Sequence, residues 1–189
     1  MCPSAPQHPR RSSLRLENFD YSIAEVYFIT ICTSERKTIL GASFKKNFRP
    51  SAIGHIVSEC WFELPYHYAR LELGAFVVMP NHIHLLRTVP DGQTLERTMQ
   101  YVKRGFSYEA GKRFGIHGPL WQKSYVDRRV RDALECERYR GYIHQNPVRA
   151  GLVGTAEEFA YSSMNQALLL DELPQRLKPE VLTTPVMHR

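Results

Sequence analysis

The sequence has no long apolar run and few cysteines. Its longest hydrophobic segment is far too short to cross a bilayer, and its first residues lack the apolar core of a signal peptide. We therefore expect a cytoplasmic protein with no membrane partner. The four cysteines (Cys2, Cys32, Cys60 and Cys136) are scattered and form no Cys-x-x-Cys pair. This spacing favours reduced thiols over disulfides or a zinc site.

Acidic residues are fewer than basic ones. The chain has 19 Asp and Glu against 25 Lys and Arg, which gives a net charge of +6 and a pI of about 9.2. This balance favours a polyanionic partner without identifying it. With 189 residues, 43% of them hydrophobic, the chain can bury a sizeable core. We expect one folded domain over residues 16–165, after a flexible basic arm over 1–15 and before a tail of unassigned role over 166–189.

Hydrophobic periodicity and helix-end signals predict mixed secondary structure. The expected elements are a strand over 25–32, a basic loop with Lys37 and Arg49, a helix from Ser51 to Pro65, a hairpin turning at Pro80-Asn81, a helix begun by Thr94, an extended edge over 120–130 and a helix over 132–145. This order predicts an α+β fold, in which an antiparallel sheet is covered by helices on one face.

The segment Val78-Met79-Pro80-Asn81-His82-Ile83-His84 places two histidines on one strand. Because alternate residues of a strand share a face, His82 and His84 project together while Ile83 points to the opposite side. Two neutral imidazoles at this spacing provide half of a metal site. Hydrogen-bonded histidines on a half-exposed strand explain the same pattern, and the pair alone does not decide between the two interpretations.

Residues 142–152 carry a second candidate pair. Tyr142 and Asn146 lie four residues apart and so share one helix face, and Pro147 is expected to bend or end that helix. If this face meets the two histidines, the amide oxygen supplies a third metal ligand and the phenol supplies a nucleophile. A core tyrosine that anchors the helix is the alternative. Acidic residues do not cluster near these motifs, which argues against a two-metal nuclease.

Further short motifs follow one another in order along residues 10–163. They are Arg10-Arg11-Ser12, Leu14-Arg15-Leu16, Asp20-Tyr21-Ser22, the strand over 27–32, the His-x-His segment, Gly118-Pro119-Leu120-Trp121-Gln122, Tyr125-Val126-Asp127, Val130-Arg131-Asp132, residues 142–152 and Tyr161-Ser162-Ser163. In this order and spacing the chain resembles the single-tyrosine HUH transposases of small insertion sequences, especially the REP-associated tyrosine transposases.

The resemblance implies a ferredoxin-like sheet and a specific chemistry. His82 and His84 would hold a divalent metal, Mg²⁺ or Mn²⁺, Asn146 would complete the metal site, and Tyr142 would attack DNA. The implied function is a transposase that nicks and rejoins single-stranded DNA beside hairpins through a 5′-phosphotyrosine intermediate. Neither the sequence nor the resemblance decides between a monomer and a homodimer.

Basic residues are the candidates for binding DNA phosphates. They are Arg10, Arg11, Arg15, Lys103, Arg104, Lys112, Arg113, Arg128 and Arg129. A solvated helix face explains those on the second helix equally well.

Two other classes of protein explain part of these motifs. A nucleic-acid-binding domain without catalysis leaves Tyr142 and Asn146 unexplained. A metal-dependent phosphodiesterase that uses water leaves the tyrosine unexplained.

Overall fold

A computed structural model describes residues 25–44, 47–67, 73–89 and 94–165 of the 189-residue chain. The predicted basic arm (1–15) and C-terminal tail (166–189) lie outside these residues. Among the described residues, no helix is long and apolar enough to cross a membrane.

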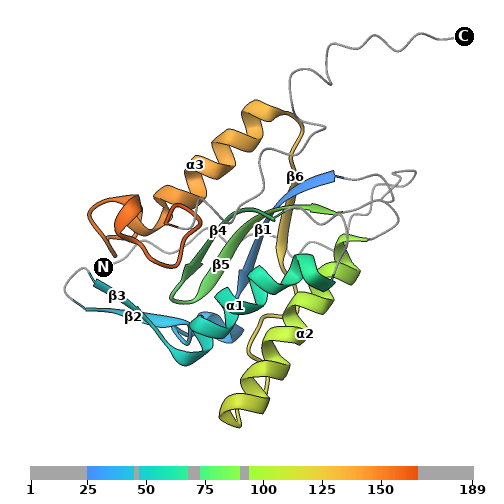
Figure 1. Cartoon of the computed structure of the whole chain (residues 1–189), viewed down its shortest axis with the longest axis vertical. Helices are drawn as coiled ribbons and strands as arrows, with labels where there is room; N and C mark the ends of the chain where they lie inside the picture. The colour runs from blue at the N-terminus through green and yellow to red at the C-terminus, as the bar shows by residue number, and fades with distance from the viewer. Residues whose placement is uncertain (1–24, 45–46, 68–72, 90–93, 166–189) are drawn as a thin grey trace, which may run out of the picture.

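The centre of the fold is a four-stranded sheet in the order β4-β5-β1-β6, with every neighbouring pair antiparallel (Figure 1). Its strands are β1 (Glu25–Cys32), β4 (Leu73–Met79), β5 (His82–Val89) and β6 (Val126–Arg129). The helix α1 (Ala52–His67) connects β1 to β4, and α2 (Leu95–Phe114) connects β5 to β6. Two β-α-β crossovers around a central β1 make the ferredoxin-like arrangement, so the predicted α+β class and antiparallel sheet are confirmed.

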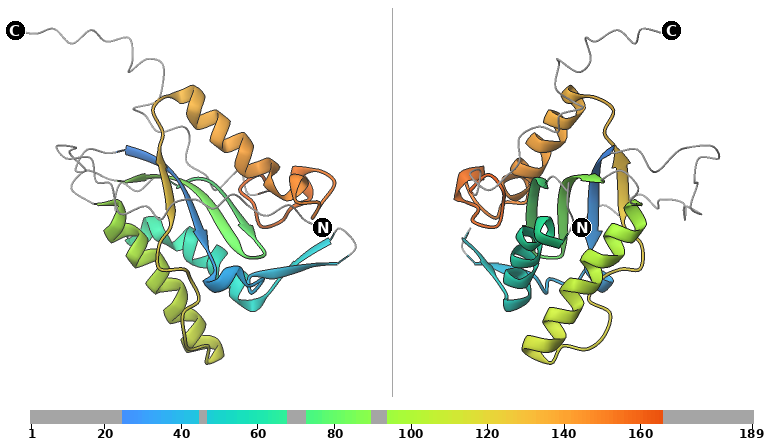
Figure 2. Two further views of the ribbon diagram at one scale, coloured as in Figure 1. Left: turned by 180° about the vertical axis from the view of Figure 1, so that it is seen from behind. Right: turned by 45° about the vertical axis from the view of Figure 1, so that its right-hand side comes forward.

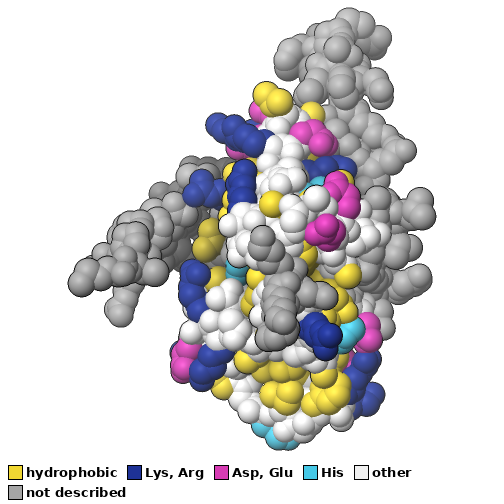
Figure 3. Space-filling view, turned by 90° about the vertical axis from the view of Figure 1, so that its left-hand side faces the viewer, with side chains coloured by type: hydrophobic (Ala, Val, Ile, Leu, Met, Phe, Trp, Pro, Cys, Tyr) yellow, Lys and Arg dark blue, Asp and Glu magenta, His cyan; other side chains and the backbone are white. Residues whose placement is uncertain are grey.

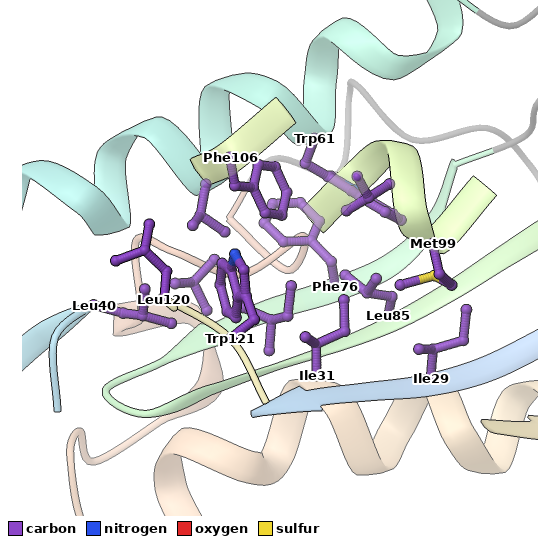
Figure 4. Packing of buried hydrophobic residues seen from close by; sticks show 14 of the residues in the cluster. Ile29, Ile31, Leu40, Trp61, Phe76, Leu85, Met99, Phe106, Leu120 and Trp121 are labelled. Carbon is purple, nitrogen blue, oxygen red and sulfur yellow. The ribbon is translucent and has the colours of Figure 1, made fainter. Parts of the chain in front are cut away.

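One face of the sheet packs against α1 and α2. Residues such as Ile29 and Ile31 of β1 and Leu85 of β5 point to this side, where they meet Trp61 of α1 and Phe106 of α2 (Figure 4). All five side chains are at most 2% exposed, so this layer is the larger hydrophobic core. Their alternation along the strands follows from the two-residue period of β-structure.

The opposite face packs against a third helix, α3 (Ala133–Arg149). Val26 and Phe28 of β1 and Leu86 of β5 point to this side and form a second cluster with Ile143 of α3. Figure 2 shows α3 on one side of the sheet and α1 and α2 on the other. The expectation that the helices cover one face therefore holds for α1 and α2 and is wrong for α3. Amphipathic periodicity shows that a helix packs on a sheet but not on which side.

Local end signals set most of the element boundaries. Ser51 Oγ accepts a hydrogen bond from Gly54 N (3.1 Å) at the start of α1, Thr94 Oγ1 accepts one from Arg97 N (3.2 Å) at the start of α2, and Asp132 accepts one from Glu135 N (2.7 Å) at the start of α3. The end of α2 is Gly115 in the left-handed conformation, with φ of 63°. The sequence predicts the helix starts at Ser51 and Thr94.

Two helix ends and one loop differ from the prediction. The helix α1 continues two residues past Pro65, and α3 continues past Pro147 to Arg149, since Ala150 N still donates to Asn146 O (3.0 Å). The segment predicted as a basic loop contains a short hairpin, β2 (Gly41–Phe44) and β3 (Asn47–Pro50). Two strands of four residues are too short to show a reliable two-residue period. The described chain also includes the one-turn helices η1 (Ser34–Arg36) and η2 (Ala156–Glu158).

The segment after η2 pairs with the outer edge of β4. Val78 N donates to Tyr161 O (2.9 Å), Ser163 N donates to Phe76 O (3.0 Å), and Phe76 N donates to Ser163 Oγ (3.0 Å). The same serine hydroxyl bonds His144 Nε2 of α3 at 2.8 Å. This segment, residues 161–163, therefore joins the sheet edge to α3.

Candidate active site

The two histidines lie where the β4-β5 hairpin leaves its turn, on the face that α3 covers. In the β1-β5 register His82 pairs with Cys32 and His84 pairs with Thr30, while Ile83 points into the opposite core, as predicted. The two imidazole rings stand edge to face with centroids 4.7 Å apart. The hairpin thus brings both rings to one place.

Hydrogen bonds fix the inner nitrogen of each ring. His82 Nδ1 lies 2.7 Å from Asn81 Oδ1, and His84 Nδ1 lies 2.8 Å from Thr30 Oγ1. Asn81 is oriented by its own Nδ2, which donates to Arg36 O (3.3 Å), so its oxygen faces the imidazole. His82 Nδ1 therefore donates its proton, which leaves the lone pair on Nε2. The Thr30 hydroxyl can accept from His84 in the same way.

Burial keeps both imidazoles neutral. It lowers the pKa of His82 to about 4, helped by the positive charge of Arg36, and it lowers the pKa of His84 to about 3, helped by His82. Neutral rings held through Nδ1 are the form of histidine that binds metals through Nε2. The pair thus has the protonation state and the orienting bonds of metal ligands.

Tyr142 projects from α3 toward this pair. Its ring lies edge-on to His84 at a centroid distance of 5.3 Å and edge-on to Phe28 at 5.8 Å. The Arg149 guanidinium carbon lies 5.5 Å from the ring centroid. The side chain is 38% exposed, so the phenol can be reached from solvent. Tyr142 is therefore not the buried anchor that the alternative interpretation required.

The direction of α3 places Asn146 on the same face of the helix as Tyr142, toward the end of β5 that carries the histidines. Tyr139 stacks on Phe28 at 4.5 Å, and Phe28 pairs with Leu86, two strand steps from His84. Proceeding from Tyr139 to Tyr142, the helix thus moves along β5 from Leu86 toward the turn. Asn146 is half-buried and lies one helical turn further in this direction.

The donor set fits a divalent cation. Among the described residues, His, Cys, Asp and Glu form no group of three that could hold a metal, so a cation here would rest on the two imidazoles and on uncharged oxygens such as the Asn146 amide. The sequence identifies the histidines, Tyr142 and Asn146. It does not identify Thr30, Asn81 or Phe28, because their roles depend on the strand register and on the placement of α3.

Two of the basic candidates already have partners within the protein. The half-buried Lys103 Nζ donates to the carbonyl oxygens of Gln122 and Lys123, and burial lowers its pKa. Arg113 pairs with Glu59 (2.5 Å) and Glu109 (2.8 Å).

The other basic candidates that the structure describes lie on two separate elements. Arg104 and Lys112 are exposed on α2, and Arg128 and Arg129 are exposed on the edge strand β6. Arg10, Arg11 and Arg15 lie outside the described residues. In the face shown in Figure 3, Lys and Arg side chains form a discontinuous column along one side. Their contacts with DNA stay a prediction.

Comparison with known proteins identifies the family of the chain. The family model "Transposase IS200 like" matches residues 24–146, more than half of the chain. An uncharacterised Haemophilus influenzae protein is 26% identical over 163 residues, covering 75% of this chain and 89% of that protein. A REP-associated tyrosine transposase of Escherichia coli is 25% identical over 96 residues, covering 50% of this chain and 55% of that protein.

A solved structure has the same fold. It is a REP-associated tyrosine transposase bound to a REP hairpin, which aligns with a TM-score of 0.63 and 19% identity over 93% of this chain and 95% of that one. The chain belongs to the IS200-like transposase family, a family of DNA strand-transferring endonucleases.

Proposed function

We propose that this transposase nicks and rejoins single-stranded DNA beside hairpins, with Tyr142 as the nucleophile and His82, His84 and Asn146 as metal ligands. The observation that carries the proposal is the exposed Tyr142 phenol, whose ring lies 5.3 Å from that of a neutral, hydrogen-bonded His84. The solved relative is bound to a REP hairpin, which supports hairpin DNA as the substrate class.

The reaction is a transesterification. The phenol oxygen of Tyr142 attacks the scissile phosphorus, the bond from phosphorus to the 3′ oxygen breaks, and the 3′ oxygen leaves as a hydroxyl. The DNA then carries a 5′-phosphotyrosine link, and a 3′-hydroxyl that attacks this phosphorus restores the phosphodiester and releases the phenol. A bound Mg²⁺ or Mn²⁺ would polarise the phosphate and orient it for in-line attack, and imidazole ligands favour Mn²⁺.

The neighbouring residues position the nucleophile. The edge-on contact with Phe28 limits rotation of the Tyr142 ring, and the Arg149 guanidinium makes a cation–π contact that helps to hold the ring in place. Thr30 and Asn81 hold the two imidazoles in one orientation. The site is therefore organised before substrate arrives.

A covalent adduct tests the proposal. Labelled single-stranded hairpin DNA is incubated with the protein and Mn²⁺ and analysed on a denaturing gel, where the wild type should give a shifted protein-DNA band. Tyr142→Phe should abolish this band with DNA binding intact, because it removes one oxygen and little volume. Tyr108→Phe and Tyr139→Phe should keep it. A water-using phosphodiesterase would still cut after Tyr142→Phe, and a binding-only protein would never cut.

A further inference from the structure

A groove separates α2 from the segment that follows it. Its volume is about 830 Å³, within the size range of small-molecule sites, and it lies toward the α1 and α2 side of the sheet, away from Tyr142. After α2 the chain turns and runs back alongside the helix (Figure 2). One wall is α2, with Arg104 and Tyr108, and the other is the returning segment, with His117, Lys123 and Tyr125.

The wall opposite α2 is held in place by hydrogen bonds. Lys103 reaches from α2 to the carbonyl oxygens of Gln122 and Lys123. Ser34 N donates to Leu120 O (2.8 Å) and Gln122 N donates to Cys32 O (2.9 Å), which attach the segment to the end of β1. Trp121 also lines the groove and packs against Phe106 of the core at 5.7 Å. The groove is therefore built into the fold.

The lining combines an exposed aromatic ring with positive charge. Tyr108 is 66% exposed, and the Lys112 ammonium lies 5.9 Å from its ring centroid. The exposed side chains of Arg104 and Lys123 also line the groove. An aromatic face beside cations is the combination that binds an unpaired nucleobase and its phosphate, because every base has a face that stacks and every nucleotide carries a negative charge.

The strand register brings one end of the groove wall, at Gln122, near the strand that carries the histidines. Gln122 hydrogen-bonds Cys32 on one side of β1, and Cys32 pairs with His82 on the other side. Two strand spacings, roughly 10 Å, therefore separate the backbone of the groove wall from that of the histidine strand. A DNA strand that crosses the end of β1 can reach both places.

We propose that this groove binds one or two unpaired nucleotides of the strand that flanks the scissile phosphate. Tyr108 stacks on a base, and Arg104 and Lys123 contact phosphates. The position of these nucleotides beside the scissile phosphate rests on the proposed function. The binding of single-stranded DNA by the groove is tested separately.

Binding is measured by fluorescence anisotropy with a labelled twelve-residue oligothymidine, using full-length Tyr142→Phe protein so that cleavage cannot interfere. Adding Tyr108→Ala should weaken binding by about 5- to 160-fold, the range that stacking of a base on an aromatic side chain spans. The matched control is Tyr101→Ala, which removes another exposed tyrosine of α2 that does not line the groove and should change affinity less than twofold.

Salt dependence separates phosphate contact from stacking. Lys123→Gln should reduce the slope of log affinity against log salt by about 0.7, because one phosphate contact is lost. Lys37→Gln is the control, since Lys37 is an exposed lysine that pairs with Glu35 (2.8 Å) and does not line the groove. Oligothymidine that contains 5-iodouracil, cross-linked by light and mapped by mass spectrometry, should label the peptide that contains Tyr108.

The outcomes distinguish this inference from the proposed function. Unchanged affinity in Tyr108→Ala, or cross-links only outside α2 and residues 116–125, overturns the groove assignment even if the wild type forms its covalent adduct. Weakened binding in Tyr108→Ala with no adduct in the wild type overturns the proposed function and leaves the groove as a single-strand site. Binding of no DNA by any variant overturns both.

Discussion

Thr30 orients His84, and Thr30→Val tests that role with little change in volume. The substitution removes the 2.8 Å bond between Thr30 Oγ1 and His84 Nδ1 and leaves a buried ring nitrogen without this partner. We expect a stability loss of about 1–3 kcal/mol from the unsatisfied group. Loss of such an orienting partner weakens metal binding by about 10- to 100-fold, equivalent to about 1.4–2.7 kcal/mol.

Calorimetric titration with Mn²⁺ and the Mn²⁺ dependence of adduct formation measure this effect, with thermal melts to correct for stability. Thr98→Val is the control, because Thr98 is a buried threonine of α2 whose hydroxyl donates to Thr94 O (3.0 Å) far from the histidines. It should lose similar stability and keep its Mn²⁺ affinity. Equal Mn²⁺ affinity in Thr30→Val and wild type would refute the orienting role of Thr30.

Three other changes test separate parts of the site and the helix that carries it. His82→Ala or His84→Ala should abolish adduct formation on the denaturing gel while DNA binding by anisotropy persists; wild-type cleavage in the double variant would contradict the metal assignment. Arg149→Ala should slow single-turnover adduct formation about tenfold, the scale of a cation–π contact, with little change in DNA affinity, and an unchanged rate would remove it from the mechanism. Hydrogen bonds from Arg131 hold the pKa of Glu135 below its ordinary 4.5. The ionised Glu135 carboxylate therefore stabilises the folded protein at neutral pH, and this contribution is lost as the pH falls through the lowered pKa. Urea titrations should therefore show Glu135→Gln less stable than wild type by about 1 kcal/mol at pH 7, since the guanidinium partners are exposed. This difference should shrink as the pH falls below 4.5, and a difference independent of pH would exclude the charge as its cause.

Local signals in the sequence are sufficient for several elements of the fold. The β-branched and aromatic run of β1, the Pro80-Asn81 turn and the Thr94 cap each depend on a few neighbouring residues, and the structure has all three where they are predicted. The two-residue spacing of His82 and His84 and the four-residue spacing of Tyr142 and Asn146 likewise reflect local periodicity. Only the resemblance to the transposase family linked the two pairs, and the structure brings Tyr142 beside His84.

Features that depend on long-range packing could not be predicted from the sequence. That α3 covers the face opposite α1 and α2 depends on how the chain crosses the sheet after β6. That Thr30 lies opposite His84 depends on a strand register between residues 54 positions apart. The groove beside Tyr108 likewise requires residues 116–125 to fold back along α2, which no motif in that segment indicates.

The pairing of residues 161–163 with β4 satisfies the hydrogen-bonding groups of this edge strand from within the chain. An open edge strand offers unpaired amide and carbonyl groups to other chains and promotes aggregation. Here Ser162 and its neighbours occupy the β4 edge, whereas the opposite edge, β6, presents the exposed charges of Arg128 and Arg129. Removing the chain beyond Asn146, where the family match ends, would uncover β4 and take away the serine that bonds His144. The residues after α3 thus cover the β4 edge of the sheet that carries the histidines, where another molecule could otherwise pair.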